Sequence, residues 1–129
     1  MKSEKDVKKK TKVILDRHGW FWWMIPANGY GKSGVSDFHA FKTGTFMAIE
    51  TKFGSNKPTA LQIGFLNSVR REDGFGFVVN DKNIDWLEVF CAAFGRSTAA
   101  ASRGEKPDAN DGATMLNAIA ELSNKLLDV

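Results

Sequence analysis

The feature that most restricts the fold of this chain is a predicted β-hairpin at residues 36–52. Two strand-like stretches, 36–42 and 45–52, flank Thr43 and Gly44, a pair that suits a tight turn. Side chains alternate between two faces along a strand, so residues two apart share a face. The hairpin therefore predicts a β-sheet and decides which side chains of the two strands lie together.

The rest of the chain alternates between helical and strand-like patterns. Besides the hairpin, we predict a helix at 3–17 with Ser3 as its N-cap, a buried aromatic strand at 20–25, a mobile loop at 27–34, a helix at 59–72, a strand at 75–79 and a helix at 81–94. The order of helix, three strands, helix, strand and helix predicts a mixed α/β (α+β) fold.

The C-terminal third has a different composition. Residues 95–112 show almost no periodicity and are rich in Ser, Ala, Gly and charged residues, which predicts a flexible linker. Apolar residues recur at helical spacing again from 113 to 127. We therefore expect three parts: a folded core at 1–95, a linker at 96–112 and a C-terminal helix at 113–129.

Length, cysteine count and charge exclude several classes of protein. A chain of 129 residues has room for one domain, and Cys91, the single cysteine, excludes an internal disulfide and a zinc site built from thiolates alone. The longest strongly apolar stretch, 20–25, is far shorter than the roughly 20 residues that span a bilayer. We expect a cytoplasmic protein with no membrane partner.

The first 17 residues hold seven Lys/Arg and three Asp/Glu, which suits either a polyanionic partner or a solvated helix face.

The ionisable residues of the predicted hairpin form the candidate site. Asp37 begins the first strand, and Glu50, Thr51 and Lys52 end the second. Two carboxylates and the Thr51 carbonyl are the oxygen donors that Mg²⁺ or Mn²⁺ prefers, and Lys52 could orient a water or stabilise charge on a phosphate. The alternative is a surface salt bridge between strands, worth about 0–1 kcal/mol. The apolar sequence around both acids favours a site, because buried acids repel each other unless protonated or bound to a cation.

These residues resemble the motifs of the PD-(D/E)XK nuclease superfamily, and within it those of the small VRR-NUC nucleases of phages and bacteria. The matching blocks, in chain order, are Glu4 in the first helix, Gly34-Val35-Ser36-Asp37, Glu50-Thr51-Lys52, and Pro58-Thr59-Ala60-Leu61-Gln62 at the start of the next helix. The resemblance continues through the strand that follows Gly74 and covers roughly residues 3–94. Ser36 departs from the family's pattern, which has proline there.

The resemblance implies a restriction-endonuclease-like core with a metal-dependent phosphodiesterase site. In that site Asp37 and Glu50 would be metal ligands, and Lys52 would be the catalytic lysine. Gln62 would lie near the site, and Glu4 would contribute to it. A helix-start acid such as Glu4 also has a simple explanation in the helix dipole.

The function implied is that of an Mg²⁺-dependent (or Mn²⁺-dependent) DNA endonuclease that cuts branched DNA, such as a four-way junction, as a homodimer. If the chain is phage-encoded, its compartment would be the host cytoplasm. Two alternatives stay open: a non-catalytic DNA-binding or assembly module that retains the nuclease fold, and a phage interaction protein whose acids form structural ion pairs.

Other residues are weaker candidates. His18 and His39 lack a partnered metal-ligand spacing, and His39, two residues from Asp37, is more simply a structural histidine. We expect the aromatic run 20–23 to pack in the core rather than to stack bases, and Cys91 to be a small core residue. The lysines of the first helix and the Arg70-Arg71 pair could together form a footprint for phosphates.

Overall fold

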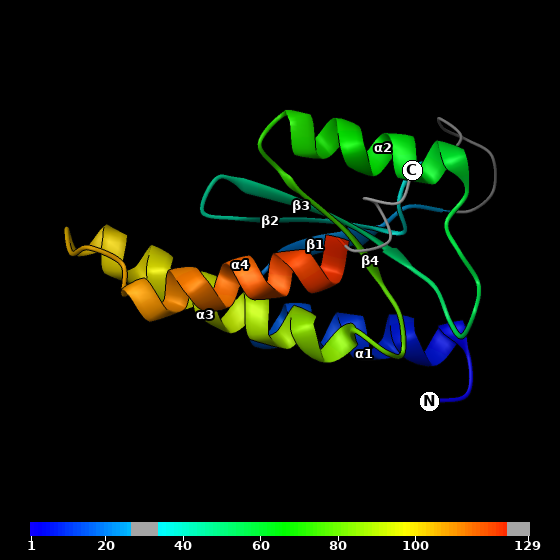
Figure 1. The fold of residues 1–129 in the computed structure, drawn as a ribbon, viewed down its shortest axis with the longest axis horizontal. Helices are drawn as coiled ribbons and strands as arrows, with labels where there is room; N and C mark the ends of the chain where they lie inside the picture. The colour runs from blue at the N-terminus through cyan, green and yellow to red at the C-terminus, as the bar shows by residue number, and fades with distance from the viewer. Residues whose placement is uncertain (27–33, 124–129) are drawn as a thin grey trace.

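The computed structural model describes residues 1–26 and 34–123. Its elements are, in chain order, α1 (Glu4–Arg17), β1 (Phe21–Met24), β2 (Phe38–Lys42), β3 (Thr45–Thr51), α2 (Ala60–Arg71), β4 (Phe75–Val79), α3 (Ile84–Ser102) and α4 (Ala109–Ser123) (Figure 1). The predicted mixed α/β fold is confirmed, including the order of helix, three strands, helix and strand. The predicted loop at 27–34 lies outside the described residues except for Gly34.

The four strands form one sheet in the order β1-β2-β3-β4. The pairs β1–β2 and β2–β3 are antiparallel, and β3–β4 is parallel. Phe38 pairs with Ile49, so the same register places Asp37 opposite Glu50 at the open end of the hairpin. The parallel pair needs a crossover connection, which α2 supplies.

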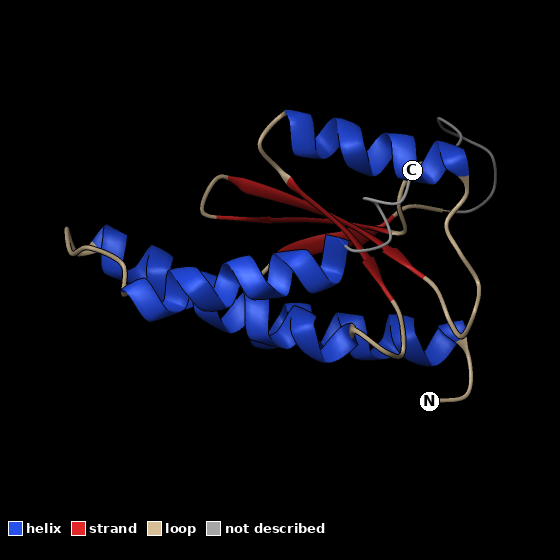
Figure 2. Ribbon diagram, in the orientation of Figure 1, coloured by secondary structure: helices blue, strands red, loops and turns tan. Residues whose placement is uncertain are grey.

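Helices cover both faces of the sheet, with α1, α3 and α4 on one face and α2 on the other (Figures 1 and 2). The larger core lies under the three helices and holds alternate strand residues such as Phe38, Met47 and Phe77. A smaller core lies under α2 on the other face of the sheet, and Ala48 and Val78 both point into it. Glu50, two residues after Ala48, therefore lies on the side of the sheet that carries α2.

The helix α2 approaches the sheet closely at a glycine of β4. A Cβ atom on Gly76 would lie 2.6 Å from the main-chain oxygen of Leu66, whereas a Cβ atom on Gly64 of the same helix would meet nothing within 4 Å. The absence of a side chain at position 76 is thus what lets this turn of α2 rest on the strand.

We expect Gly76→Ala to lower the free energy of unfolding by about 1–3 kcal/mol, because backbone must move to accept the methyl group. Gly64→Ala is the matched control and is expected to stabilise by roughly 0.5–1 kcal/mol, since alanine favours a helix. Urea denaturation of both variants measures the difference. Equal stability of the two would contradict the tight α2–β4 contact.

The prediction of a flexible linker at 96–112 is wrong for most of that range. The helix α3 continues to Ser102, and α4 already begins at Ala109. Alanine has the highest helix propensity, and Ser97 and Ala100 are buried, so the small residues that suggested a linker form a helix face that packs. Arg96 also donates a hydrogen bond to Asp111 across the two helices. The predicted C-terminal helix starts earlier than expected, and its residues after Ser123 lie outside the described part.

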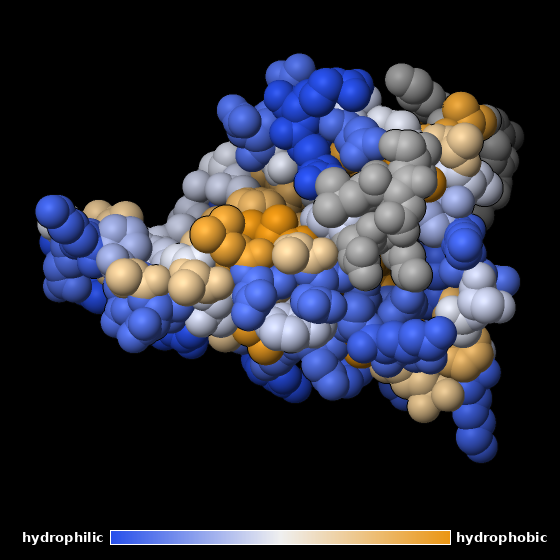
Figure 3. Space-filling view, viewed as in Figure 1, coloured by the Kyte–Doolittle hydropathy of each residue, from blue (hydrophilic) through white to orange (hydrophobic). Residues whose placement is uncertain are grey.

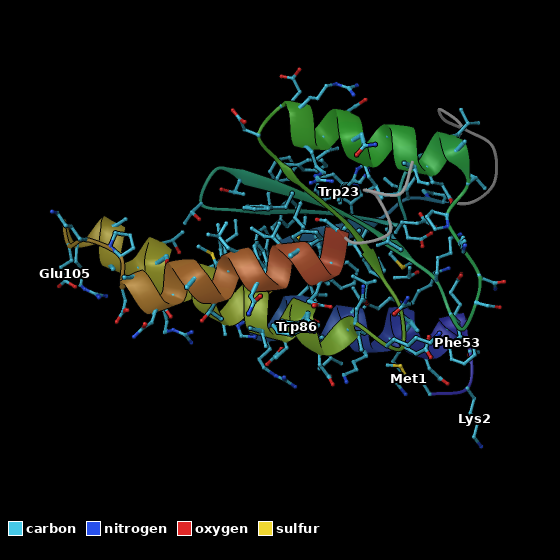
Figure 4. The ribbon with its side chains drawn as sticks, in the orientation of Figure 1. Met1, Lys2, Trp23, Phe53, Trp86 and Glu105 are labelled. Atoms are coloured by element: carbon cyan, nitrogen blue, oxygen red, sulfur yellow. The ribbon has the colours of Figure 1, made fainter. Side chains whose placement is uncertain are left out.

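The outer end of this helical hairpin projects beyond the sheet and carries Glu105 (Figure 4). Its surface is hydrophilic, whereas hydrophobic side chains gather beside α4 on the same face of the molecule (Figure 3). None of the helices in the described residues combines the length and apolar character needed to cross a membrane.

The aromatic strand is half exposed, which corrects the prediction that 20–25 is buried. Trp20 is buried and Trp22 packs against the core, but Phe21 is 70% exposed and Trp23 is 38% exposed. The reason is the position of β1 at the edge of the sheet, where α2, which contacts β3 and β4, does not cover it. Cys91 is buried, as expected.

Candidate functional site

Two carboxylates meet where β2 begins and β3 ends. The main-chain N–H of Asp37 donates a hydrogen bond to Glu50 Oε1 at 3.2 Å. Asp37 Oδ2 accepts two hydrogen bonds from Thr51, one from its main-chain N–H at 2.9 Å and one from its hydroxyl at 2.7 Å. Residues thirteen positions apart in the sequence are thus held together by the pairing of the hairpin.

Lys52 completes the cluster from the end of β3. Its Nζ lies 3.1 Å from Glu50 Oε2, and the side chains of Lys52 and Glu50 are only 15% and 2% exposed. The main-chain N–H of Lys52 donates to Val79 O, which ties this position to the neighbouring strand. The structure therefore brings Asp37, Glu50, Thr51 and Lys52 into one site.

Burial makes the charged form of Glu50 unfavourable. Removal from water is the main cause and the negative charge of Asp37 the next, and together they raise the pKa of Glu50 to about 7. The Lys52 ammonium and the hydrogen bond from Asp37 act in the opposite direction without cancelling the rise. Near neutral pH, Glu50 is poised between a protonated and a charged form.

A lysine of α1 also belongs to this site. Burial tends to lower the pKa of Lys8, but the nearby carboxylates of Asp37, Glu4 and Glu50 outweigh that effect, so its pKa is raised. Lys8 Nζ lies 3.2 Å from Glu4 Oε2, one helical turn away. The predicted site residue Glu4 is thus linked to the acid pair through Lys8. The sequence showed Lys8 only as part of a basic run, although its spacing of four residues from Glu4 could have singled it out.

Two of the three residues before Asp37 have defined structural roles. Gly34 has φ +83°, and a Cβ atom there would lie 2.6 Å from the backbone of Leu61, so this contact with the start of α2 requires glycine. Ser36 is buried, and its hydroxyl donates to Phe38 O at 3.3 Å. The serine at this position therefore has a hydrogen-bond partner of its own.

Gln62 is engaged in capping α2. Its Oε1 accepts from the Thr59 N–H at 2.9 Å, and its own N–H donates to the Thr59 hydroxyl, which forms a capping box. Among the described residues, no hydrogen bond connects the Gln62 side chain to Asp37 or Glu50. Its place near the site stays a prediction.

The donors present fit a hard divalent cation. Among the described residues, no group of three or more His, Cys, Asp or Glu side chains is arranged to hold a metal ion. Mg²⁺, however, is commonly bound through one or two carboxylates and keeps several waters. Asp37 and Glu50 supply two carboxylates, and a cation between them would offset the repulsion that raises the pKa of Glu50.

Neither the comparison with protein-family models nor that with curated proteins finds a match to this chain. The VRR-NUC resemblance therefore stays a prediction. Among solved structures, the chain is similar to that of Archaeoglobus fulgidus Hjc, a Holliday junction resolvase from an archaeal hyperthermophile, with a TM-score of 0.47 and 19% sequence identity. The similarity covers 59% of this chain and 66% of that chain, slightly less than two thirds.

Proposed function

We propose that this protein is a metal-dependent DNA endonuclease that hydrolyses phosphodiester bonds. The observation that carries the proposal is the pairing of half-buried Asp37 with buried Glu50, with Lys52 Nζ 3.1 Å from Glu50 Oε2. Structural ion pairs at a surface are exposed and gain little. A carboxylate whose pKa is raised to about 7 by burial, and further by a second acid, is typical of a functional site.

In this proposal Asp37, Glu50 and the Thr51 carbonyl hold Mg²⁺, or Mn²⁺. The cation would supply Lewis-acid stabilisation of the phosphate and make a bound water more acidic. Lys52 Nζ lies beside Glu50 Oε2. From there it can orient the attacking water by hydrogen bonding and offset the negative charge that develops on the phosphate. The Thr51 hydroxyl and N–H fix Asp37 Oδ2, which orients that carboxylate before a ligand arrives.

The first helix supplies further charge. Lys8, close to both acids and paired with Glu4, would contact a phosphate next to the one that is cut. The roles of Glu4 and Gln62, membership of the VRR-NUC nucleases, the preference for branched DNA, the homodimer and the cytoplasmic location are parts of the proposal that rest on the sequence.

A second candidate is a non-catalytic DNA-binding module, and the closed network of hydrogen bonds favours it. Both Glu50 oxygens and Asp37 Oδ2 have protein partners, so the cluster holds together without a ligand. Such a module would bind DNA in a salt-sensitive manner and would not cut it.

Cleavage of labelled duplex, flap and four-way DNA with Mg²⁺ or with EDTA separates the two candidates. The nuclease is expected to cut a branched substrate only with the divalent cation. Lys52→Ala is expected to lower the rate by at least about 100-fold, because it removes charge stabilisation at the reacting phosphate. Lys57→Ala, an exposed lysine in the following loop, is the control. Binding without Mg²⁺-dependent cutting of any substrate would favour the non-catalytic module.

A further inference from the structure

Exposed aromatic rings extend the sheet face that carries the acid pair. We define the aromatic platform as Phe21 and Trp23 of β1 together with Phe41 of β2. Their exposed fractions are 70%, 38% and 41%. Exposed large apolar groups that gather on one surface mark a binding surface more often than isolated ones do.

The sheet register arranges these rings in rows. Phe21 pairs with Phe41, and Phe41 pairs with Phe46, which forms one row across three strands. Trp23 pairs with His39 in the next row. Residues directly opposite each other in a sheet lie on the same face, so all five rings lie on the side that carries α2.

The rings also support one another. Trp23 stacks on Phe41 with ring centres 5.8 Å apart, and Phe41 contacts Phe46 at 4.8 Å. On the inner side, the His39 ring is stacked on Phe65 of α2 with an interplanar angle of 8°. Burial lowers the pKa of His39, which keeps this ring neutral. Trp23 is therefore held by its neighbours while part of its surface faces solvent.

The same rows lead to the candidate site. Ile25 donates its N–H to Asp37 O, and Asp37 lies opposite Glu50, so the acid pair lies at the end of these strands, one row beyond Trp23 and His39. Asp37, just before β2, and Phe41 lie four positions apart along the chain, a distance of about 13 Å. That length corresponds to about four nucleotides of a stacked strand at ~3.4 Å each. A strand with one phosphate at the acid pair would thus reach the aromatic platform.

The chemistry around the platform suits a polyanion that carries flat rings. Lys52 and Lys8 lie at the acid row, and Arg71 donates to Ser68 Oγ at the edge of a groove of about 380 Å³ lined by Phe46 and Phe65. Glu72 lines the same groove, and the acids of the site offset the charge of Lys52 and Lys8 until a cation is bound. Aromatic surface adjoining cations is how proteins bind single strands without reading their sequence.

We propose that the aromatic platform stacks the unpaired bases of a strand whose phosphate lies at the acid pair. The inference rests on the proposed function and specifies its substrate: DNA with a single-stranded segment beside the phosphate that is cut. In intact duplex the base faces are already covered by neighbouring bases, so the rings would find no partner. This surface therefore selects flaps and junctions with unpaired bases over perfect duplex.

The test compares two single strands of equal length and charge, an oligothymidine and an oligomer of abasic sites. Binding is measured by fluorescence anisotropy in EDTA with Glu50→Gln protein, so that no cutting interferes. We expect oligothymidine to bind at least about ten-fold more tightly, and Trp23→Ala to remove that preference without changing the affinity for the abasic strand. Trp23→Phe should retain most of the preference for oligothymidine, because phenylalanine still offers a flat ring. Phe21 lies far from the core. If the platform acts as a unit, Phe21→Ala lowers the preference for oligothymidine in the same way.

The control is Leu116→Ala on α4, a side chain that is also 70% exposed but lies outside the platform. Equal affinity of the wild-type surface for the two strands would overturn the proposal that the platform stacks bases. So would a shift from dimer to monomer on Trp23→Ala, measured by sedimentation, with the base preference intact, because the rings would then be an interface between copies. Base-dependent binding by a wild-type protein that never cuts DNA would instead refute the nuclease proposal alone.

Discussion

Glu50→Gln is expected to lower the rate of DNA cleavage by about three orders of magnitude, a typical cost of removing a central catalytic group. Glutamine keeps the shape of the side chain and can still accept a hydrogen bond from the Asp37 N–H. It removes the negative charge that would hold the cation and that pairs with Lys52 Nζ at 3.1 Å. Single-turnover cleavage of a labelled branched substrate at saturating Mg²⁺ measures the change.

Glu121→Gln is the matched control, since Glu121 is exposed on α4 and the chemical change is the same. It should leave the rate unaltered. Isothermal calorimetry with Mg²⁺ alone should show weaker binding to Glu50→Gln than to wild type, independently of any substrate. Cleavage at the wild-type rate by Glu50→Gln protein would sink the assignment of this acid pair as the site.

The same substitution is expected to stabilise the metal-free protein above neutral pH. The pKa of Glu50 is about 7 in the fold against an ordinary value of 4.5. Between these values the folded state keeps a proton that the unfolded state has lost, so stability falls as pH rises from about 4.5 to about 7 and then levels. Glutamine cannot lose that proton. At pH 8 the free energy of unfolding of Glu50→Gln should exceed that of wild type by on the order of 3 kcal/mol. This figure already includes the attraction between Lys52 and Glu50, because that attraction contributes to the pKa of Glu50.

Urea denaturation in EDTA at pH 5 and pH 8 provides the measurement. The stability of Glu50→Gln relative to wild type should increase between the two values, whereas that of Glu121→Gln should stay constant. Added Mg²⁺ should restore much of the wild-type stability at pH 8, by about 2.7 kcal/mol at a concentration 100 times its dissociation constant. A relative stability that does not change with pH would contradict a raised pKa for Glu50.

Much of the candidate site follows from local sequence rules. Thr43 and Gly44 both adopt positive φ, as a tight hairpin turn requires, and this turn sets the register that brings Asp37 opposite Glu50. The period of two along β3 then puts Glu50 on the α2 side of the sheet. Local turn geometry and strand alternation suffice for this step, so the sequence could predict it.

The remaining features depend on which surfaces tertiary packing covers. The exposure of Phe21 and Trp23 follows from the edge position of β1, and an apolar run looks the same in sequence whether it is central or at an edge. The helical state of 95–102 depends on burial of small side chains such as Ala100. Lys8 gains its importance from a carboxylate on a distant strand, a proximity that helix periodicity alone does not reveal.

The connectivity of the sheet also has a consequence for the order of folding. The β2–β3 hairpin joins neighbours in the chain, whereas β3 meets β4 only after α2 has closed a longer loop. Hairpins form in roughly 1–10 μs, and contacts of greater sequence separation form more slowly. We therefore expect Asp37 and Glu50 to come together before α2 docks and the rest of the fold buries Glu50. Water would still surround the two acids at that moment, so their mutual repulsion would act mainly on the late docking step.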